Sequence, residues 1–401
     1  MTSTPDLPTA GPLTGTLVVD LSRALAGPHA TMMMGDLGAR IVKVEAPGHG
    51  DDTRGWGPPF VEPDEGARES TYFLSANRNK ESIALDLKDE TDREAFLALV
   101  KRADVLVENF RTGVLDRLGL GFDTLHELNP RLVVLSITGF GHDGPEGGRA
   151  GYDQIAQGEA GLMSITGPNA DDPQKVGTPI SDILAGMYGA YGVLAALLER
   201  ERTGVGRVVR TSLLAATVGV HGFQSTRWTI AGHVGRAAGN HHASISPYGL
   251  FHCKDGAVQI AVGSELLWKR FCDGFGLDVA LPGFATNPER VANKEATIEL
   301  VEGVFADWDA EPLLARLAEI GVPAGKVRSI DEVYAWDQTR SQGLVIDVEH
   351  DTLGSLTLAG PPLRFFGEGG VETTWRGHQA PPTLDQHGAA IREELASQER
   401  A

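Results

Sequence analysis

The chain has 401 residues, with 35 Lys and Arg against 54 Asp and Glu, so its formal net charge is −19. With 41% hydrophobic and 22% charged residues it can bury a core, which excludes wholesale disorder. An acidic surface repels phosphate backbones, so we expect no general binding to nucleic acid or to anionic membranes. The length predicts about two or three domains.

The cysteine content and the apolar runs indicate the compartment of the cell in which the protein is expected. Two cysteines, Cys253 and Cys272, exclude a disulfide framework and a cysteine-based zinc site. The N-terminal residues show no basic or apolar run of the kind found in secretory signals. The longest apolar run, 183–198, is shorter than a membrane span of about 20 residues and predicts a buried helix. We expect a soluble, cytoplasmic protein without a membrane partner.

The first half alternates short apolar runs with helical spacing. The runs predict buried strands at Leu17–Asp20, Ile41–Glu45, Asp104–Glu108 and Leu132–Ile137. Helical spacing over Asp92–Arg102 is typical of the connection between parallel strands. The fold class is therefore α/β, and we assign residues 1–205 to a large Rossmann-like domain with a doubly wound sheet.

The second half becomes richer in helices. A long helix is expected over Asp182–Arg202, followed by a linker helix over 206–225. A smaller α+β domain is predicted over 226–325, with a hairpin formed by Tyr248–Cys253 and Ala257–Gly263. Residues 326–345 are read as a second linker. The segment 346–401, with short strands near 345–348 and 355–358, completes the chain.

Several familiar motifs are absent or incomplete. Gly139-x-Gly141-x-x-Gly144 matches a dinucleotide fingerprint, but Pro145 follows at once and no acid lies about 20 residues further on. We expect a loop there, at the carboxyl end of a strand. Neither a phosphate-binding P-loop nor a G-x-S-x-G elbow occurs. The adjacent His241 and His242 lack the spacing of a helical metal site, so no metal is predicted.

The segment 178–182 brings Asp182 to the start of the long helix. One interpretation is a simple N-cap, in which Ser181 or Asp182 accepts hydrogen bonds from first-turn amides. The other is a nucleophile, because the positive end of the helix dipole favours an ionised carboxylate. Glycines at 186, 189 and 192 leave one helix face bare, which permits either close packing or a thin channel.

Basic and amide side chains gather near the predicted strand–helix junctions. They are Arg23, Arg54, Arg78, Lys80, Lys88, Asn109 and Arg117. In so acidic a protein, such a cluster predicts a local positive field suited to a phosphorylated ligand.

The motifs, taken together, resemble those of a known family. They are VDLS at 19–22, AGP at 26–28, GDLGA at 35–39, IVKVE at 41–45, NRNK at 77–80, ADVLVENF at 103–110, GYD at 151–153 and SD at 181–182. Over about residues 14–385 the chain resembles the class III CoA-transferases, the family of formyl-CoA transferase and the carnitine CoA-transferases. The runs at 50–60 and 75–80 resemble the succinate–glutarate CoA-transferases most closely.

The resemblance implies a mechanism, a ligand and an assembly. Asp182 matches the family's nucleophile, which forms an anhydride with the acyl group and then an aspartyl-CoA thioester. Coenzyme A is expected as a substrate, with no permanently bound cofactor. Family contacts to CoA map onto Ala24, Leu25, Ala26, Leu85, Lys88, Asn109, Phe110, Arg117, Tyr152 and Asp153. The implied subunit is an open ring, interlocked with a second copy in a homodimer, with the C-terminal segment returning to the large domain.

Some residues of this chain differ from those of the family, and these differences narrow the expected substrates and reactions. Formyl-CoA transferase has glutamine where this chain has Leu25 and glutamate where it has Asp153, which argues against formate and oxalate. The glycine-rich loop that shields the anhydride in formyl-CoA transferase has no clear counterpart in this chain. We predict that residues 232–246 take its place. An acyl-CoA racemase is the first alternative, disfavoured because Tyr152 replaces the racemases' histidine and a tyrosine of ordinary pKa near 10 is a poor base. A CoA-binding protein without turnover is the second.

Overall fold

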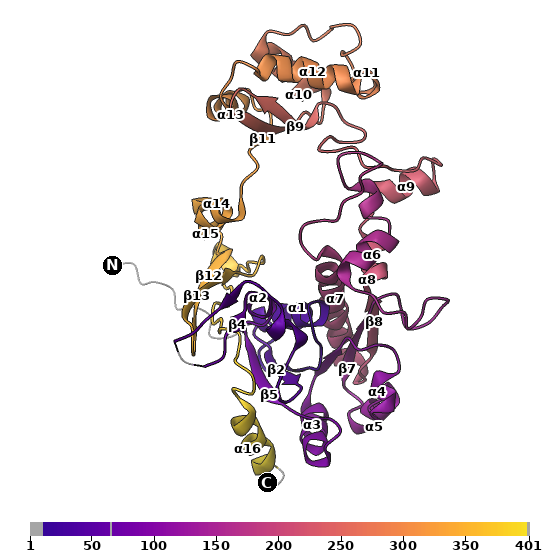
Figure 1. Cartoon of the computed structure of the whole chain (residues 1–401), viewed down its shortest axis with the longest axis vertical. Helices are drawn as coiled ribbons and strands as arrows, with labels where there is room; N and C mark the ends of the chain where they lie inside the picture. Colours follow the sequence, from indigo (N-terminus) through magenta and orange to yellow (C-terminus); the bar gives the residue numbers. More distant parts are fainter. Residues whose placement is uncertain (1–10, 65, 399–401) are drawn as a thin grey trace. The chain divides into compact units, whose positions relative to one another are not determined.

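The computed structural model describes residues 11–64 and 66–398. The chain divides into two compact units (Figure 1). The first unit draws on Met1–Leu162, Val176–Phe223 and Asp337–Ala401, and the second on Met163–Lys175 and Gln224–Trp336. The C-terminal segment therefore packs in the same unit as the first half of the chain.

A six-stranded, all-parallel sheet forms the centre of the first unit, in the order β5-β2-β1-β6-β7-β8. Its strands are β1 Leu17–Asp20, β2 Arg40–Glu45, β5 Lys80–Ala84, β6 Val105–Glu108, β7 Val133–Thr138 and β8 Val208–Ser212. The four predicted strands are confirmed. From β1 the chain adds strands first on one side and then on the other, so the order reverses between β1 and β6. In such sheets the carboxyl ends of the strands at the reversal line a ligand crevice.

Two strands of this six-stranded sheet were not predicted. β5 was missed because Lys80 and Ser82 make it look polar, yet both side chains are satisfied inside the protein, on Asp20 and Glu45. β8 lies within 206–225, so the predicted linker helix is wrong for that stretch. Its two valines and Thr211 suit an extended strand that pairs with β7, and helix α8, Leu213–Gly219, follows directly.

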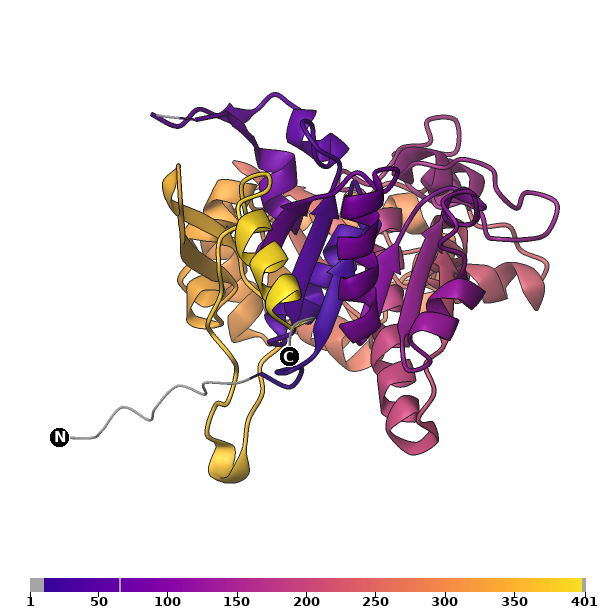
Figure 2. The ribbon, with the colours of Figure 1, turned by 90° about the horizontal axis from the view of Figure 1, so that it is seen from below.

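Helices cover both faces of this sheet (Figure 2). One core joins alternate strand residues such as Val18 and Val105 to α1, Ala26–Asp36, and α7, Ile180–Thr203. The other core joins their neighbours in the strands to α3, Glu90–Arg102, with α5, Phe122–Leu128, and α16, Gly388–Gln398. Burial on both faces explains why the central strands read as continuous apolar runs.

The glycines of α7 serve close packing. A methyl group added at Gly186 would lie 2.6 Å from the carbonyl oxygen of Ala26, and one at Gly192 would lie 2.6 Å from a methyl carbon of Val209. The bare face is thus filled by α1 and the sheet, and it leaves no channel at these positions. By length and composition α7 is the one helix in the described ranges that passes for a membrane span, a test that core helices of soluble proteins also pass.

The C-terminal segment is fastened to the sheet by hydrogen bonds and ion pairs. The backbone of Gln379 bonds the backbone N–H and the side chain of Asn79, at 3.1 and 2.8 Å. Further along, Glu394 of α16 pairs with Arg40 and Arg102. The remaining elements of the first unit are η1 Asp52–Gly55, β3 Phe60–Val61, β4 Glu69–Ser70, α2 Thr71–Ala76, α4 Val114–Arg117, α6 Asp153–Glu159, α15 Asp337–Ser341, β12 Val345–His350, β13 Gly354–Ala359 and η3 Glu368–Gly370.

The second unit has its own core. Its antiparallel sheet has the order β11-β10-β9, and β9 with β10 forms the predicted hairpin. Trp268, Phe271 and Phe305 pack against that sheet. Its elements are η2 Met163–Ile165, α9 Phe223–Thr229, β9 Tyr248–Cys253, β10 Gly256–Ala261, α10 Glu265–Phe275, α11 Asn287–Ala292, α12 Lys294–Phe305, α13 Ala310–Glu319, β11 Ala324–Gly325 and α14 Ile330–Ala335. Unlike the predicted 226–325 domain, this unit also includes 163–175 and extends to 336.

Candidate active site

Asp182 lies in the first turn of α7, but it does not cap its own helix. Residue Pro179 precedes the helix and offers no side-chain acceptor. The cap comes from Asp153 of α6, whose Oδ1 accepts hydrogen bonds from the amides of Ser181 and Asp182, at 2.7 and 3.3 Å. The simple N-cap interpretation of Asp182 is therefore wrong, because a carboxylate from another helix satisfies those amides.

This arrangement leaves the Asp182 carboxyl group uncommitted. Its side chain makes no hydrogen bond or ion pair within residues 11–64 and 66–398, and the residue is partly exposed. Burial, and after it the charge of Asp153, raise the pKa of Asp182 to about 7. We expected the helix dipole to keep the group fully ionised; desolvation and the like charge outweigh that effect. Asp182 is thus a poorly solvated carboxylate, which makes it more reactive toward an electrophile.

Asp153 is better satisfied than Asp182. Besides the two amides, its Oδ2 accepts a hydrogen bond from Nε2 of Gln157, at 2.7 Å. Ser181, which precedes Asp182 in the first turn of α7, is buried, and its hydroxyl accepts a hydrogen bond from Thr217 at 2.8 Å. Hydrogen bonds to Asp153 of α6 and from Thr217 of α8 therefore fix the first turn of α7. The carboxyl group of Asp182 takes no part in these bonds.

Tyr72 of α2 is a site residue that the sequence analysis missed. Burial, followed by the charges of Asp182 and Asp153, raises its pKa to about 12. The phenol therefore stays protonated, and the charges of both aspartates act on it. Its ring packs edge-on against Trp56, with ring centroids 5.1 Å apart. No local signal marks Tyr72, because it reaches the site through tertiary structure alone.

A pocket at the carboxyl edge of the sheet collects several predicted CoA contacts. Leu85, Lys88 and Phe110 line it together, with residues from the ends of β1 and β2. It therefore lies beside the point where the strand order reverses. Asn109 ties the two flanking loops together, because its side chain bonds both the N–H and the carbonyl oxygen of Arg23, at 2.8 and 2.6 Å.

The other predicted CoA contacts are less closely gathered. Ala24 and Leu25 follow β1 in the loop that lines this pocket, and Ala26 begins α1. Arg117 is exposed at the end of α4 and is followed by Leu118, which does line the pocket. Tyr152 precedes α6 and is 67% exposed.

The predicted basic cluster is only partly available to a ligand. Arg54 pairs with Glu45 at 2.8 Å, Arg78 with Asp36 at 2.5 Å, and Lys80 with Asp20 at 3.0 Å, all with largely buried side chains. These three bases balance internal acids, so assigning them to the field around a phosphate was wrong. Arg23 and Lys88 remain exposed at the pocket.

Comparisons with known proteins agree with the motifs. The model of CoA-transferase family III matches residues 13–388. The chain is 38% identical over 386 residues to the succinyl-CoA:glutarate CoA-transferase of Mus musculus, covering 96% of this chain and 86% of that protein. It is 37% identical over 404 residues to the acetyl-CoA:oxalate CoA-transferase of Acetobacter aceti, covering both completely.

Solved structures show the same relationship. A CAIB/BAIF family protein from Brucella suis superposes with a TM-score of 0.84 at 40% identity, covering 96% of this chain and 100% of that one. The protein therefore belongs to CoA-transferase family III. It is an enzyme, a CoA-transferase, whose substrates are CoA thioesters.

Proposed function

We propose that this enzyme transfers CoA from an acyl-CoA to a dicarboxylic acid such as succinate or glutarate, through covalent catalysis by Asp182. The observation that carries the proposal is the half-buried carboxyl group of Asp182. It has no hydrogen-bond partner in the described part of the chain, and it lies in the first turn of a helix that is capped by another residue. The relatives support the substrate class, since a 38% identical protein from Agrobacterium fabrum, aligned over 97% of both chains, is named succinate–glutarate CoA-transferase.

The first half of the reaction forms the covalent enzyme. A carboxylate oxygen of Asp182 attacks the thioester carbonyl carbon, the carbon–sulfur bond breaks, and CoA leaves as the thiolate. The thiolate then attacks the aspartyl carbon of the resulting anhydride. The donor acid departs as its carboxylate, and an aspartyl-CoA thioester remains.

The second half runs the same steps in reverse with the acceptor. Its carboxylate attacks the aspartyl carbon, the thiolate leaves, and a second anhydride forms. The thiolate attacks the acceptor's acyl carbon, which forms the new thioester and releases Asp182 as a carboxylate. No net proton is consumed, so the enzyme needs an ionised Asp182 and stabilisation of developing negative charge. We propose the protonated Tyr72, whose pKa responds to the charge of Asp182, for that stabilisation.

The choice of acid is wider than the sequence departures indicated. Leu25 and Asp153 argued against oxalate, yet the Acetobacter aceti relative is named for oxalate. Oxalate therefore belongs among the acceptors to be assayed, beside succinate and glutarate. The sheet order, with its reversal between β1 and β6, supports the Rossmann-like description of the CoA-binding unit.

The proposal includes a homodimer. One face of α7 exposes large apolar side chains, at Met187, Tyr188, Tyr191, Leu194 and Leu198. Tyr191 and Leu198 are 72% and 69% exposed, which is unusual for an apolar stripe left in water. Light scattering coupled to size exclusion should give twice the mass of 42.7 kDa. Interlocking of two rings stays a prediction of the resemblance.

Trapping tests the reaction class. The full chain is incubated with succinyl-CoA and then treated with hydroxylamine or borohydride, and the modified peptide is mapped by mass spectrometry. We expect modification at Asp182. Asp182→Ala should lower turnover by about 10³-fold or more while CoA binding changes by less than about threefold.

Three outcomes would overturn this assignment. Modification at another residue would move the nucleophile elsewhere. Deuterium uptake at the α-carbon of an acyl-CoA, without CoA exchange, would instead identify the racemase alternative. Binding of acyl-CoA without any covalent labelling would identify a binding protein.

A further inference from the structure

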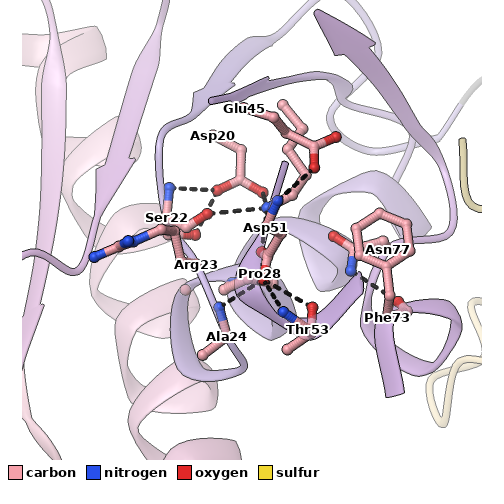
Figure 3. A network of polar contacts seen from close by, with 12 residues as sticks. Asp20, Ser22, Arg23, Ala24, Pro28, Glu45, Asp51, Thr53, Phe73 and Asn77 are labelled. Carbon is pink, nitrogen blue, oxygen red and sulfur yellow. Dashed lines mark hydrogen bonds and ion pairs between the residues drawn. The ribbon is translucent and has the colours of Figure 1, made fainter. Parts of the chain in front are cut away.

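The loop between β1 and α1 is held by side chains that reach it from β2 and from the turn after β2 (Figure 3). Nζ of Lys43 donates a hydrogen bond to the carbonyl oxygen of Ser22, at 2.9 Å. Oδ1 of Asp51 accepts a hydrogen bond from the amide of Ala24, at 3.1 Å. These two contacts fix the loop at Ser22 and at Ala24. The side chain of Asn109 fixes Arg23, between them, by its two hydrogen bonds to the Arg23 backbone.

Ala24 is the residue that needs such support. Its φ of 63° lies in the left-handed region, which a side chain with a Cβ disfavours. An alanine stays in that conformation only where surrounding contacts over-determine it. The hydrogen bond from its amide to Asp51 is a contact of this kind.

Asp51 is itself locked in place. Its carboxylate forms an ion pair with Nζ of Lys43, at 2.9 Å, and both side chains are completely buried. Its Oδ1 also accepts hydrogen bonds from the amide and the hydroxyl of Thr53, at 2.9 and 2.7 Å. In this low-dielectric interior, either charge would be costly if it were left unpaired, so Lys43 and Asp51 stay together. The Asp51 carboxylate therefore keeps one orientation, with Oδ1 directed at the amide of Ala24.

The loop also has a fixed relation to the nucleophile. The carbonyl oxygen of Ala26, at the start of α1, lies against Gly186 of α7 so closely that a Cβ there would be 2.6 Å away. Gly186 comes about one helical turn after Asp182. A shift of the loop would therefore change the distance between whatever the loop binds and the carboxylate that attacks.

We propose that Asp51, held by Lys43, is a positioning residue that keeps Ala24 in its left-handed conformation and so preorganises the loop 22–26 to bind coenzyme A. The proposal rests on the proposed function and on the CoA contacts that the family resemblance implies for Ala24, Leu25 and Ala26, next to the pocket that Ser22 and Arg23 line. Asp51 acts through Ala24, so its effect on affinity depends on the backbone that it supports. Preorganisation raises affinity because the bound ligand no longer has to order the loop.

The test measures the dissociation constant of coenzyme A by calorimetry, using the full-length chain. Asp51→Ala should weaken CoA binding about tenfold, the factor that corresponds to the left-handed penalty of one alanine. Asp51→Asn keeps an amide oxygen for Ala24 and should stay within about threefold of the original chain. Adding Ala24→Gly to Asp51→Ala should restore most of the affinity, because glycine needs no support at positive φ.

A matched control separates positioning from general destabilisation. Asp36 is also a buried aspartate paired with a base, Arg78, but it lies at the far end of α1. Asp36→Ala should lower the melting temperature and leave CoA affinity unchanged. Hydrogen exchange of the peptide covering 21–26 should speed up in Asp51→Ala and not in Asp36→Ala.

The outcomes distinguish this proposal from the one on which it rests. If the original chain fails to bind CoA, the proposed function fails. If the original chain binds and Asp51→Ala, correctly folded, binds equally well, only the positioning role is refuted. Lack of rescue by Ala24→Gly would also refute it, because the loss of affinity would then not depend on the conformation of Ala24. If Asp51→Ala does not fold, the double variant Lys43→Met/Asp51→Ala removes both buried charges and takes its place. This variant also loses the bond from Lys43 to Ser22, so CoA binding should weaken about tenfold or more and Ala24→Gly should restore part of the affinity.

Discussion

Two pairs of aspartates in the first unit have opposite electrostatic surroundings. Asp20 and Asp51, beside β1, each lie against a lysine, at 3.0 Å from Lys80 and 2.9 Å from Lys43. Asp153 and Asp182, at the head of α7, have no cation paired with them anywhere in the described part of the chain.

Burial acts to raise the pKa of a carboxyl group in both places. For Asp20 and Asp51 the nearby lysines outweigh burial and hold the pKa below the ordinary value. For Asp182 no paired cation in the described part of the chain opposes burial, and the charge of Asp153 adds to it, so its pKa rises. The same residue type is therefore structural in one place and suited to chemistry in the other, and neighbouring charge decides which.

Removing a carboxylate from the lysine-paired site of Asp20 and Asp51 should destabilise the fold more than removing one from the site of Asp153 and Asp182. Asp20→Asn leaves Lys80 and Lys43 with one fewer anion in a buried site and should destabilise the protein by about 3–5 kcal/mol. Chemical denaturation checks this value. A loss below about 1 kcal/mol would show that the lysines are solvated or neutral, and the contrast between the two pairs would disappear.

Asp153→Ala tests the cap at the unpaired site. The variant leaves the amides of Ser181 and Asp182 without their acceptor, so we expect a stability loss of about 1 kcal/mol. Turnover should fall about tenfold or more, since Asp182, the proposed nucleophile, loses the hydrogen bonds that fix its helix turn. Asp116→Ala, an acidic residue on exposed α4, is the control and should change neither quantity. Unchanged turnover in Asp153→Ala would remove Asp153 from the site.

Asp182→Asn should stabilise the protein, and only at higher pH. A carboxyl group whose pKa is raised from 3.8 to about 7 makes the folded state lose stability as the pH rises through that window, because the unfolded chain binds fewer protons there. The variant lacks this loss, so it should be more stable by about 1–2 kcal/mol at pH 8, after allowance for solvent screening, and indistinguishable at pH 4. Equal melting temperatures at pH 8 would contradict the raised pKa.

The sequence was informative where the signal is local. Apolar runs placed the four central strands, and the start of an apolar helix marked Asp182 before the geometry was known. What it could not show depends on contacts between distant residues. The cap from Asp153 comes from 29 residues away, and the field at Tyr72 comes from another element altogether.

The sequence predicted least well which charged residues form buried ion pairs. Arg54, Arg78 and Lys80 look like surface cations near strand ends, yet each is buried against an acid. Residue type alone does not reveal which of many acids and bases find partners inside the fold. The family resemblance supplied the predictions of Asp182 as nucleophile and of the CoA contacts. The ion pairs that distinguish Asp20 and Asp51 from Asp182 could be seen only in the folded structure.

The most direct measurement is the pH dependence of covalent labelling at Asp182 in a single turnover with succinyl-CoA, compared with Asp153→Asn. Labelling should rise with pH to a plateau, with its midpoint near 7 in the original chain, because only the ionised carboxylate attacks. In Asp153→Asn, which removes the like charge, the midpoint should move to lower pH. A rate that stays flat from pH 5 to pH 8 in both proteins would contradict the claim that neighbouring charge sets the reactivity of this carboxylate.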